Sequence, residues 1–347
     1  MMTSSGPTEP DAAPAESGAA PTLADLSEGA VLARIFPRLP TADAQLVGPG
    51  DDAAVIAAPD GRFVVTTDMM IQGPDFRLAW STPYDLGWKA AATNLSDVAA
   101  MGARPTALVV AIAAPPSTPV SVLEGICDGM RDCCAALAPG CGVVGGDLSA
   151  SDALTLAVTA FGDLQARDPV LRSGARLGDT VALCGRLGEA GEGLELLFRF
   201  GVDDAGTPDA ARADLLKAQH PRALAAQLRP EPPIGSGPAA ALAGASAMLD
   251  VSDGLAIDAG RIARASGVGL NFFRAALGEA PERALGGGED HGLLATFPPE
   301  ATLPAGFRAG CGHGRCGPGA CGRCAAHAGR LGPVPRLGRC RLNGVVA

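Results

Sequence analysis

Strand-like and helix-like segments alternate along most of this chain, and this alternation restricts the possible folds more than any other feature of the sequence. Short apolar runs predict strands, and longer segments with apolar residues three and four positions apart predict helices. In the first half we expect strands at 63–67, 107–113, 142–144 and 154–161 and helices at 83–100 and 120–137. In the second half we expect strands at 180–184 and 247–251, helices at 193–200, 238–243 and 254–265, and a loop-rich segment at 201–237.

The order of these segments predicts an α/β protein with mixed sheets and two domains. The chain has 347 residues, which is enough for two separate cores. We place the N-terminal domain at 26–165 and the C-terminal domain at 166–307. Residues 1–25 are rich in Pro, Ala, Ser and Gly and predict a disordered tail. Ser27, a typical N-cap residue, marks the expected start of ordered structure.

The last forty residues, 308–347, differ in composition from the rest of the chain. They contain seven arginines and five cysteines but no acidic residue. No hydrophobic period continues beyond residue 307, so the pattern predicts no core element there. A shifted reading frame in a GC-rich gene would produce such a segment, and this is our interpretation of it.

The charge of the chain restricts its partners. A formal net charge of −10 argues against a nucleic-acid partner, because nucleic-acid binders normally carry a basic surface. An acidic protein can still bind polyphosphates through Mg²⁺, which takes oxygen ligands from carboxylates and phosphates alike. Residues 1–25 lack the regions of a signal peptide, and no segment has the ~18 consecutive apolar residues of a membrane helix. We therefore expect a cytoplasmic protein without a membrane contact.

Two acid-bearing motifs come early in the chain. Asp52 follows the glycine turn at 48–50 and precedes an apolar stretch, so its carboxylate is expected at the mouth of a strand. Thr66, Thr67 and Asp68 end a predicted strand, and hydroxyl and carboxylate oxygens side by side suit a hard cation. Each motif taken alone is also an ordinary turn or strand end, because Gly, Thr and Asp are common there.

Two further motifs place an acid among small or polar residues. Asn94 and Asp97 are three residues apart and share one face of a predicted helix, where a solvated face is the alternative interpretation. Asp147 comes directly after a pair of glycines that ends at Gly146. A phosphate could approach the backbone of this pair closely. The G-x-G-x-x-G string at 140–145 is not interpreted as a dinucleotide motif, because its glycines flank a strand and open no helix.

The last two motifs lie in the second domain. Asp250 and Ser252 are expected to point the same way on a strand, and Asp253 is a candidate cap of the next helix. The glycine turn at 286–288 presents Glu289 and a second acid. Each motif is weak alone. Six of them in one chain that lacks a G-x-x-x-x-G-K-[ST] string favour phosphate chemistry that depends on metal-binding acids.

In this order and at these spacings, the motifs resemble those of the thiamine-monophosphate kinases, within the aminoimidazole ribonucleotide synthetase-like superfamily of ATP enzymes. The resemblance covers about residues 26–307 and includes the Leu-Arg-Ser-Gly string at 171–174. It implies a two-domain fold similar to aminoimidazole ribonucleotide synthetase, with an ATP- and Mg²⁺-binding N-terminal domain that forms a homodimer. It also implies transfer of the γ-phosphate of ATP to thiamine monophosphate, assisted by several Mg²⁺ ions.

The resemblance assigns roles to individual residues. Metal-binding positions of the family correspond to Asp52, Thr66, Thr67, Asp68, Asp97, Asp147, Asp250 and Asp253. Nucleotide-binding positions correspond to Gly146, Asp147, Arg172 and Ser252. Substrate-contacting positions correspond to Asp75 and Glu289, although many family members have His where this chain has Asp75. No catalytic general base is expected, because the attacking phosphate oxygen is already ionised at neutral pH.

Two other functions stay open from the sequence. One is a different ATP-using enzyme of the same superfamily, which would transfer or activate another group. The other is a catalytically inactive, nucleotide-binding homologue. The segment 308–347 motivates this second alternative, because family members usually end with further core structure and an aromatic residue that helps to close the substrate site.

Overall fold

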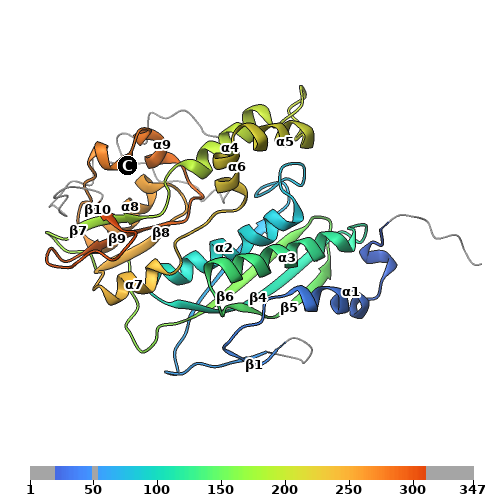
Figure 1. The fold of residues 1–347 in the computed structure, drawn as a ribbon, viewed down its shortest axis with the longest axis horizontal. Coiled ribbons are helices and arrows are strands. Elements are labelled where there is room, and N and C mark those ends of the chain that lie inside the picture. The colour runs from blue at the N-terminus through green and yellow to red at the C-terminus, as the bar shows by residue number, and fades with distance from the viewer. Residues whose placement is uncertain (1–19, 49–53, 310–347) are drawn as a thin grey trace, which may run out of the picture.

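Two four-stranded sheets, each formed by a different half of the chain, make up the centre of the structure (Figure 1). The structure is a computed structural model in which residues 20–48 and 54–309 are described. The strands β4 and β5 of the first sheet are parallel, and its other pairs are antiparallel, as the mixed fold class predicts. The order in this sheet is β3 (Val64–Ile71), β6 (Thr155–Asp163), β4 (Arg104–Ala114) and β5 (Gly142–Ala150).

Helices α2 (Pro83–Ala100) and α3 (Val120–Leu137) cover one face of the first sheet and have the bounds that the sequence predicts (Figure 1). A capping box fixes the start of α2: the Asp85 amide donates to Thr82 Oγ1 (3.1 Å), and the Thr82 amide donates to Asp85 Oδ2 (3.0 Å). Pro83 follows at the first helical position, where it has no amide hydrogen to satisfy. The core between helices and sheet includes Leu86, Leu95, Leu108, Ile126, Leu154 and Leu156.

The second sheet is antiparallel throughout. Its order is β10 (Arg308–Ala309), β7 (Thr180–Cys184), β9 (Gly292–Phe297) and β8 (Ala247–Val251). The bounds of β7 and β8 agree with the prediction, but the sequence pattern does not predict β9. Every residue of β9 is buried, so the strand lacks the alternation of a half-exposed strand. The helical elements around this sheet are α4 (Glu189–Phe200), α7 (Ser236–Leu242), α8 (Leu255–Ser266), η3 (Arg274–Leu277) and α9 (Pro281–Gly286).

The expectation of a loop-rich segment at 201–237 is wrong. It contains two helices, α5 (Ala210–Gln219) and α6 (Pro221–Leu228). Asp209 caps α5 by accepting the Arg212 amide at 2.8 Å, and α6 begins with its proline. Pro221, which suggests a loop when only the sequence is considered, therefore starts a helix.

The expectation of disorder at 1–25 is wrong for residues 23–25. Leu23–Asp25 form a short 3-10 helix (η1), and the Leu23 amide donates to Thr118 O (2.9 Å). Ser27 caps the next helix as predicted, by accepting the Ala30 amide. The remaining elements of this region are α1 (Glu28–Ile35), η2 (Phe36–Arg38), β1 (Gln45–Val47) and β2 (Val55–Ile56).

The ends of the chain are described only in part. The first 19 residues and residues 310–347 lie outside the described part, so the interpretation of the atypical C-terminal segment stays a prediction. The predicted division between residues 165 and 166 falls between the two sheets. Of the described helices, none combines the length and the apolarity that crossing a membrane requires.

Helices α2 and α3 approach each other at two glycines. A Cβ atom on Gly87 would lie 1.9 Å from the carbonyl oxygen of Ile126, and a Cβ on Gly129 would lie 2.1 Å from that of Tyr84. Both neighbours are backbone atoms of a helix, which cannot move aside as a flexible side chain can. The close contact of the two helices therefore depends on glycine at these positions.

Replacing Gly87 with Ala should lower the free energy of unfolding by about 1–3 kcal/mol, because the added methyl group overpacks the contact between α2 and α3. Urea unfolding followed by circular dichroism measures this change. Gly29→Ala is the matched control: Gly29 lies in α1, and its Cβ would meet no atom within 4 Å. It should leave stability unchanged or raise it by about 0.5 kcal/mol. An equal loss in both variants would contradict the packing argument.

Candidate functional site

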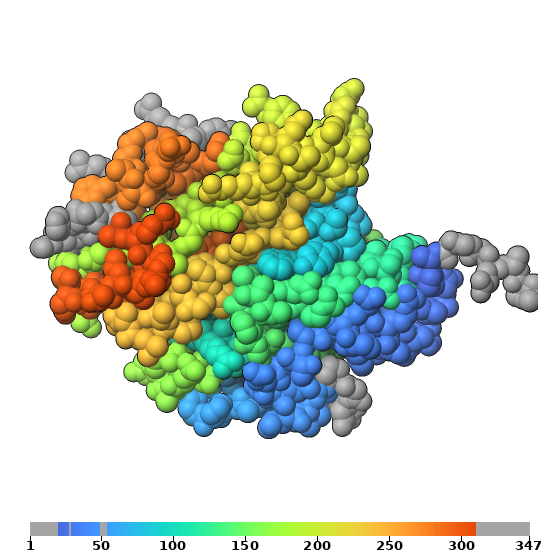
Figure 2. Space-filling model, in the orientation of Figure 1, coloured from blue at the N-terminus to red at the C-terminus, as the bar shows by residue number. Residues whose placement is uncertain are grey.

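Helix α2 lies at the junction of the two halves of the chain. It packs on β3 and β6 of the first sheet and also contacts β8 of the second. In the space-filling view, the yellow segment with α6 and α7 lies against the cyan and green helices α2 and α3 (Figure 2). Trp88 donates from Nε1 to Pro230 O (2.8 Å), and a Cβ on Gly237 would lie 2.0 Å from Ala99 O. Polar side chains on α2 can therefore meet residues of both halves.

Three carboxylates from three elements lie close together beside α2. Thr66 on β3 donates from Oγ1 to Asp97 Oδ2 on α2 (3.0 Å). Burial, together with the charges of Asp250 and Asp68, raises the pKa of Asp97 to about 7. Asp68 follows Thr66 by two residues on β3 and so lies on the same face of the strand. Strand β8, which carries Asp250, contacts α2. The fold thus brings Asp68, Asp97 and Asp250 to the same side of α2, although they are far apart in the sequence.

His291 is the nearest polar neighbour of Asp250. Its Nδ1 is 3.1 Å from Asp250 Oδ2, and the two residues are each 5% exposed. Its carbonyl oxygen accepts a hydrogen bond from Ser96 Oγ (3.2 Å) on α2. Its Nε2 is buried and has no hydrogen-bond partner among the described residues. His291 is not among the site residues predicted from the sequence, although an imidazole directly after two acids is a signal for such a role.

Asp253 lies just after β8 but has a different local role from the predicted one. The cap of α8 is Gly254, which makes no side-chain capping bond, so the expected capping by Asp253 is wrong. The Asp253 carboxylate pairs with Arg261 instead. Its amide donates to Asp258 Oδ2 (2.9 Å), and burial raises the pKa of Asp258 to about 6. The charge of Asp250 also contributes to the raised pKa of Asp258.

Thr67 and Asp147 lie apart from this group. Because Thr66 faces α2, the alternation of a strand turns Thr67 to the opposite face, where its Oγ1 donates to Val158 O (3.0 Å). Asp147 is exposed on β5, and its carboxylate accepts a hydrogen bond from Ser149 Oγ (2.8 Å). The strands β3 and β5 are the two edges of the first sheet, about 14 Å apart at ~4.8 Å per strand.

Three other predicted site residues are also separate from the carboxylates or lie beyond the described residues. Gly146 is within β5, and a Cβ there would lie 2.0 Å from Val110 O, so only glycine fits. Arg172 is exposed, and its carbonyl oxygen accepts a hydrogen bond from Ser266 Oγ (2.8 Å). Asp52 belongs to the residues that the structure does not describe.

Lys89 links α2 to the turn that carries Glu289. Its Nζ is 2.9 Å from Glu289 Oε2 and donates to Gln227 O (3.0 Å). The lysine side chain is 10% exposed and that of Glu289 is 39% exposed, so the ion pair is partly shielded from water. The Glu289 amide donates to Ser252 O (2.9 Å). Lys89 is not among the site residues predicted from the sequence, although it is one of only two lysines in the chain.

Asp75 and Lys89 line a common pocket next to α2 and α6. The Asp75 carboxylate accepts the Ile71 amide (2.8 Å) and so also stabilises its own turn. The Arg77 guanidinium stacks over two aromatic rings in this region, and burial lowers the pKa of Arg77. The two predicted substrate residues, Asp75 and Glu289, therefore lie near the same lysine. Further residues that line the pocket are Phe76, Trp80, Ser81, Leu86, Leu194, Leu197, Gln227 and Leu228.

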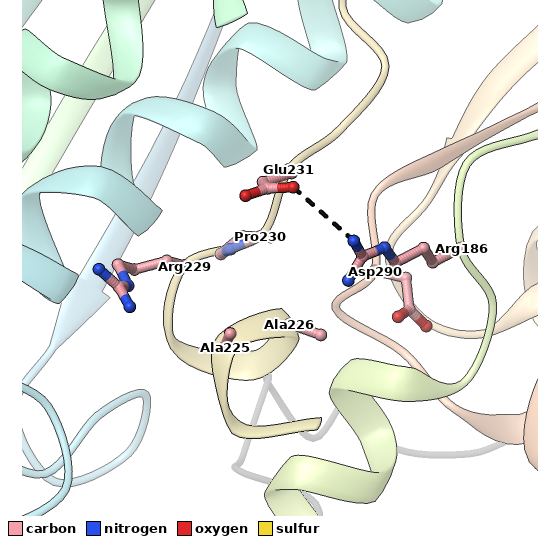
Figure 3. Close-up of a pocket in the computed structure, with 7 residues that line it drawn as sticks. All are labelled: Arg186, Ala225, Ala226, Arg229, Pro230, Glu231 and Asp290. Atoms are coloured by element: carbon pink, nitrogen blue, oxygen red, sulfur yellow. Dashed lines mark ion pairs between the residues drawn. The ribbon is translucent and has the colours of Figure 1, made fainter. Parts of the chain in front are cut away.

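A second pocket opens beside the start of α4 (Figure 3). Asp290 on its wall accepts the amides of Gly188 (2.5 Å) and Ala190 (2.9 Å) and so holds the first turn of α4. Arg186 and Glu231 form an ion pair of 3.8 Å across it. The acids in this pocket are therefore occupied by structural contacts. Its lining residues are Arg186, Ala225, Ala226, Arg229, Pro230, Glu231 and Asp290.

The carboxylates beside α2 supply oxygen atoms of the kind that a hard divalent cation binds. As they stand in the structure, no three or more His, Cys, Asp or Glu side chains within residues 20–48 and 54–309 are grouped so that they could hold a metal ion. Mg²⁺ usually takes only one or two carboxylates and completes its shell with water and phosphate. The pKa of Asp97 is raised first by burial and then by the charges of Asp250 and Asp68, and a bound cation would relieve the repulsion between these charges. These acids, with the Thr66 hydroxyl beside them, are the candidate cation ligands of the described chain.

Comparison with known proteins places this arrangement in a family context. Residues 50–164 match the family model described as AIR synthase related protein, N-terminal domain. The thiamine-monophosphate kinase of Mycobacterium tuberculosis is 44% identical over 303 residues, which cover 83% of this chain and 85% of that protein. The thiamine-monophosphate kinase structure from Stenotrophomonas maltophilia K279a has a TM-score of 0.66 at 31% identity and covers 84% of this chain and 93% of its own. A structure of AaThiL complexed with AMPPCP and TMP has a TM-score of 0.61 at 31% identity, with 78% and 85% covered.

The ion pair between Lys89 and Glu289 should contribute about 1 kcal/mol of coupling energy to folding, a modest value because water still reaches the carboxylate. A double-mutant cycle with Lys89→Met and Glu289→Gln, measured by urea unfolding, gives this coupling. The exposed pair Arg274–Glu282, with side chains 76% and 59% exposed, is the control and should show almost none. Equal coupling in the two pairs would show that burial of Lys89 adds nothing.

Proposed function

Because the chain belongs to the thiamine-monophosphate kinase family, we propose that it transfers the γ-phosphate of ATP to thiamine monophosphate, which yields ADP and thiamine diphosphate. Similarity over most of the chain to AaThiL, whose structure contains AMPPCP and TMP, supports these two substrates. The observation that carries the proposal is that β3 with Asp68 and β8 with Asp250 both pack against α2, which carries Asp97, at the junction of the two halves. An acid cluster of this kind suits a reaction between two phosphorylated molecules.

The reaction needs no proton transfer by a side chain. A phosphate oxygen of thiamine monophosphate forms a bond to the γ-phosphorus of ATP. The bond between that phosphorus and the oxygen bridging to the β-phosphate breaks, and ADP keeps the bonding electron pair. The attacking oxygen is ionised at neutral pH, so the main barrier is repulsion between anions and the alignment of the two phosphates. We infer direct transfer without a phosphoenzyme.

Asp68, Asp97 and Asp250 would hold Mg²⁺, and Thr66 would orient Asp97 through its hydrogen bond. Bound Mg²⁺ would supply positive charge that offsets the charge of the phosphates. The three carboxylates come from both halves of the chain, so the site depends on the packing of both sheets around α2. Four more metal ligands are proposed on the family resemblance alone: Asp52, Thr67, Asp147 and Asp253.

Gly146, Asp147, Arg172 and Ser252 are proposed nucleotide contacts. Gly146 is exposed on β5, so a phosphate could reach its backbone from the solvent side. Ser252 follows Asp250 by two residues, so a nucleotide held there would have its phosphates near the carboxylates. Arg172 is exposed and can move to donate hydrogen bonds to phosphate oxygens.

Asp75 and Glu289 are proposed substrate contacts on either side of Lys89. Lys89 places a positive charge between these two acids. The Asp75 carboxylate supplies hydrogen-bond acceptors where many family members have the imidazole of His. Thiamine monophosphate carries both a cationic ring system and an anionic phosphate, and this mixed lining can contact both.

Purified protein should form ADP from ATP only when both Mg²⁺ and thiamine monophosphate are present. Asp97→Asn and Asp250→Asn should each lower kcat/KM by about 10²–10³-fold, because each removes charge that holds the cation at the phosphates. A coupled assay for ADP, with chromatographic detection of thiamine diphosphate, measures both effects. Excess EDTA should abolish turnover in the unmodified protein.

The control variant for these substitutions is Asp204→Asn. The Asp204 side chain is 96% exposed and pairs with Arg212 on the surface, away from α2. Its kcat/KM should stay within twofold of that of the unmodified protein, by our order-of-magnitude expectation for surface changes. Binding of ATP without formation of thiamine diphosphate would contradict the proposal and favour an inactive homologue.

We further propose that two copies of the chain associate through the face of the first sheet opposite α2. On this face, Val65 and Met69 of β3 are 55% and 53% exposed, and Phe63 next to the strand is 55% exposed. Apolar side chains that gather on an exposed sheet are typical of contact surfaces. The family resemblance, which implies a homodimer through the N-terminal domain, agrees with this position.

Met69→Asp should convert the homodimer into a monomer, because a carboxylate at the centre of an apolar contact loses its hydration without gaining a partner. Size-exclusion chromatography with light scattering measures the mass in solution. Leu242→Asp is the control: Leu242 is 72% exposed on α7 of the other half, so this variant should stay dimeric. A monomeric unmodified protein would refute the proposed interface.

A further inference from the structure

His291 makes three hydrogen-bonded contacts, two with β8 and one with α2. Its amide donates to Val251 O (3.0 Å) at the end of β8. Its carbonyl oxygen accepts from Ser96 Oγ (3.2 Å) on α2. Its Nδ1 lies 3.1 Å from Asp250 Oδ2. This one residue therefore joins the helix of the first half to the strand of the second half.

The partners of His291 adjoin the candidate cation ligands directly. Ser96 precedes Asp97, and Val251 follows Asp250. A shift of the turn at His291 would therefore displace the two acids relative to each other. His291 is not one of the residues proposed above to bind the cation, the nucleotide or thiamine monophosphate.

The backbone at His291 is held in an unusual conformation. Its φ angle is +53°, in the left-handed region, which is uncommon for residues other than glycine, although Asn, Asp and His adopt it more often than the rest. Such a conformation persists when the surrounding contacts over-determine it, and it often occurs at functional sites. The hydrogen bonds to Val251 and Ser96 provide these contacts on both sides of the residue.

The side chain of His291 contacts only one of the two carboxylate oxygens of Asp250. Oδ2 faces Nδ1, and Oδ1 takes no part in this contact. With the proton on Nδ1, His291 donates to Oδ2 and fixes the rotation of the carboxylate. Oδ1 is then available to a cation.

We propose that His291 is a positioning residue, which orients Asp250 through Nδ1 and links it to Asp97 through Ser96, so that both carboxylates can hold one cation. The inference rests on the proposed function, because it assumes that Mg²⁺ binds at these acids. Hydrogen bonds to a metal-binding group tune metal affinity, and their loss typically weakens it 10–100-fold. His291 itself contacts the carboxylate and need not touch the substrates.

Two substitutions separate the hydrogen bond from the backbone conformation. His291→Asn places an amide donor near the position of Nδ1 and tolerates a positive φ, whereas His291→Gly tolerates the φ angle but has no donor. Binding of AMPPCP is measured by calorimetry at increasing Mg²⁺ concentration. His291→Asn should keep the half-saturating Mg²⁺ concentration within about threefold of that of the unmodified protein, and His291→Gly should raise it about tenfold or more.

A surface histidine serves as the control. His220 is exposed between α5 and α6, and His220→Asn should leave the Mg²⁺ dependence unchanged. Should His291→Gly fail to fold, His291→Gln replaces it, because Gln keeps the bulk of the side chain but moves the donor away from the Nδ1 position. Circular dichroism without Mg²⁺ checks the fold of each variant.

The outcomes distinguish this inference from the proposed function. If the unmodified protein binds AMPPCP with a dependence on Mg²⁺ and all His291 variants match it, the positioning role is refuted while the proposed function stands. The positioning role would also be refuted if His291→Asn raised the half-saturating Mg²⁺ concentration as much as His291→Gly or its replacement His291→Gln. In that case the donor that Asn retains would have no effect. If the unmodified protein shows no Mg²⁺-dependent binding, both the proposed function and this inference are refuted.

Discussion

The burial of Asp97 beside α2, within reach of the charges of Asp250 and Asp68, is the constraint around which the rest of the site is arranged. Like charges in a partly buried site cost free energy, and the raised pKa of Asp97 reflects that cost. Apolar packing must offset it, and most residues of α2 are accordingly buried against the two sheets. The repulsion also favours function, because a cation that relieves it binds more tightly than it would to a single exposed acid.

The second consequence of this arrangement is that one helix aligns the two halves of the chain. Trp88, Lys89 and Ser96 each donate to or pair with residues of the second half. Positions seven and eight apart fall on one side of a helix, so these contacts form a single row along α2. Asp97 directly follows the last of them. The distance between acids of the two halves therefore depends on the packing of α2, and substrates that bridge the halves would meet a site with fixed dimensions.

Much of the local structure followed from short-range signals. The start of α2 is defined by the capping box of Thr82 and Asp85, with Pro83 at the first helical position. Apolar spacing defines the length of the helix. The same signals predicted α3, β7 and β8 with the bounds that the structure has. They failed for β9, whose residues are all buried, and for α5 and α6, where proline and polar residues suggested loops. In both cases tertiary packing decided the conformation of a segment whose own pattern was ambiguous.

The sequence by itself determined the family resemblance, most of the helices and strands, and the acidic character of the site, because capping, periodicity and residue chemistry are local properties. Only the tertiary structure decided which acids meet. Asp68 and Asp97 lie together because β3 is an edge strand whose alternate residues face α2, while the strand order places Asp147 at the far edge of the same sheet. Likewise, only long-range packing brings His291 to Asp250 and Lys89 to Glu289, since contacts between distant segments depend on the free energy of the whole fold.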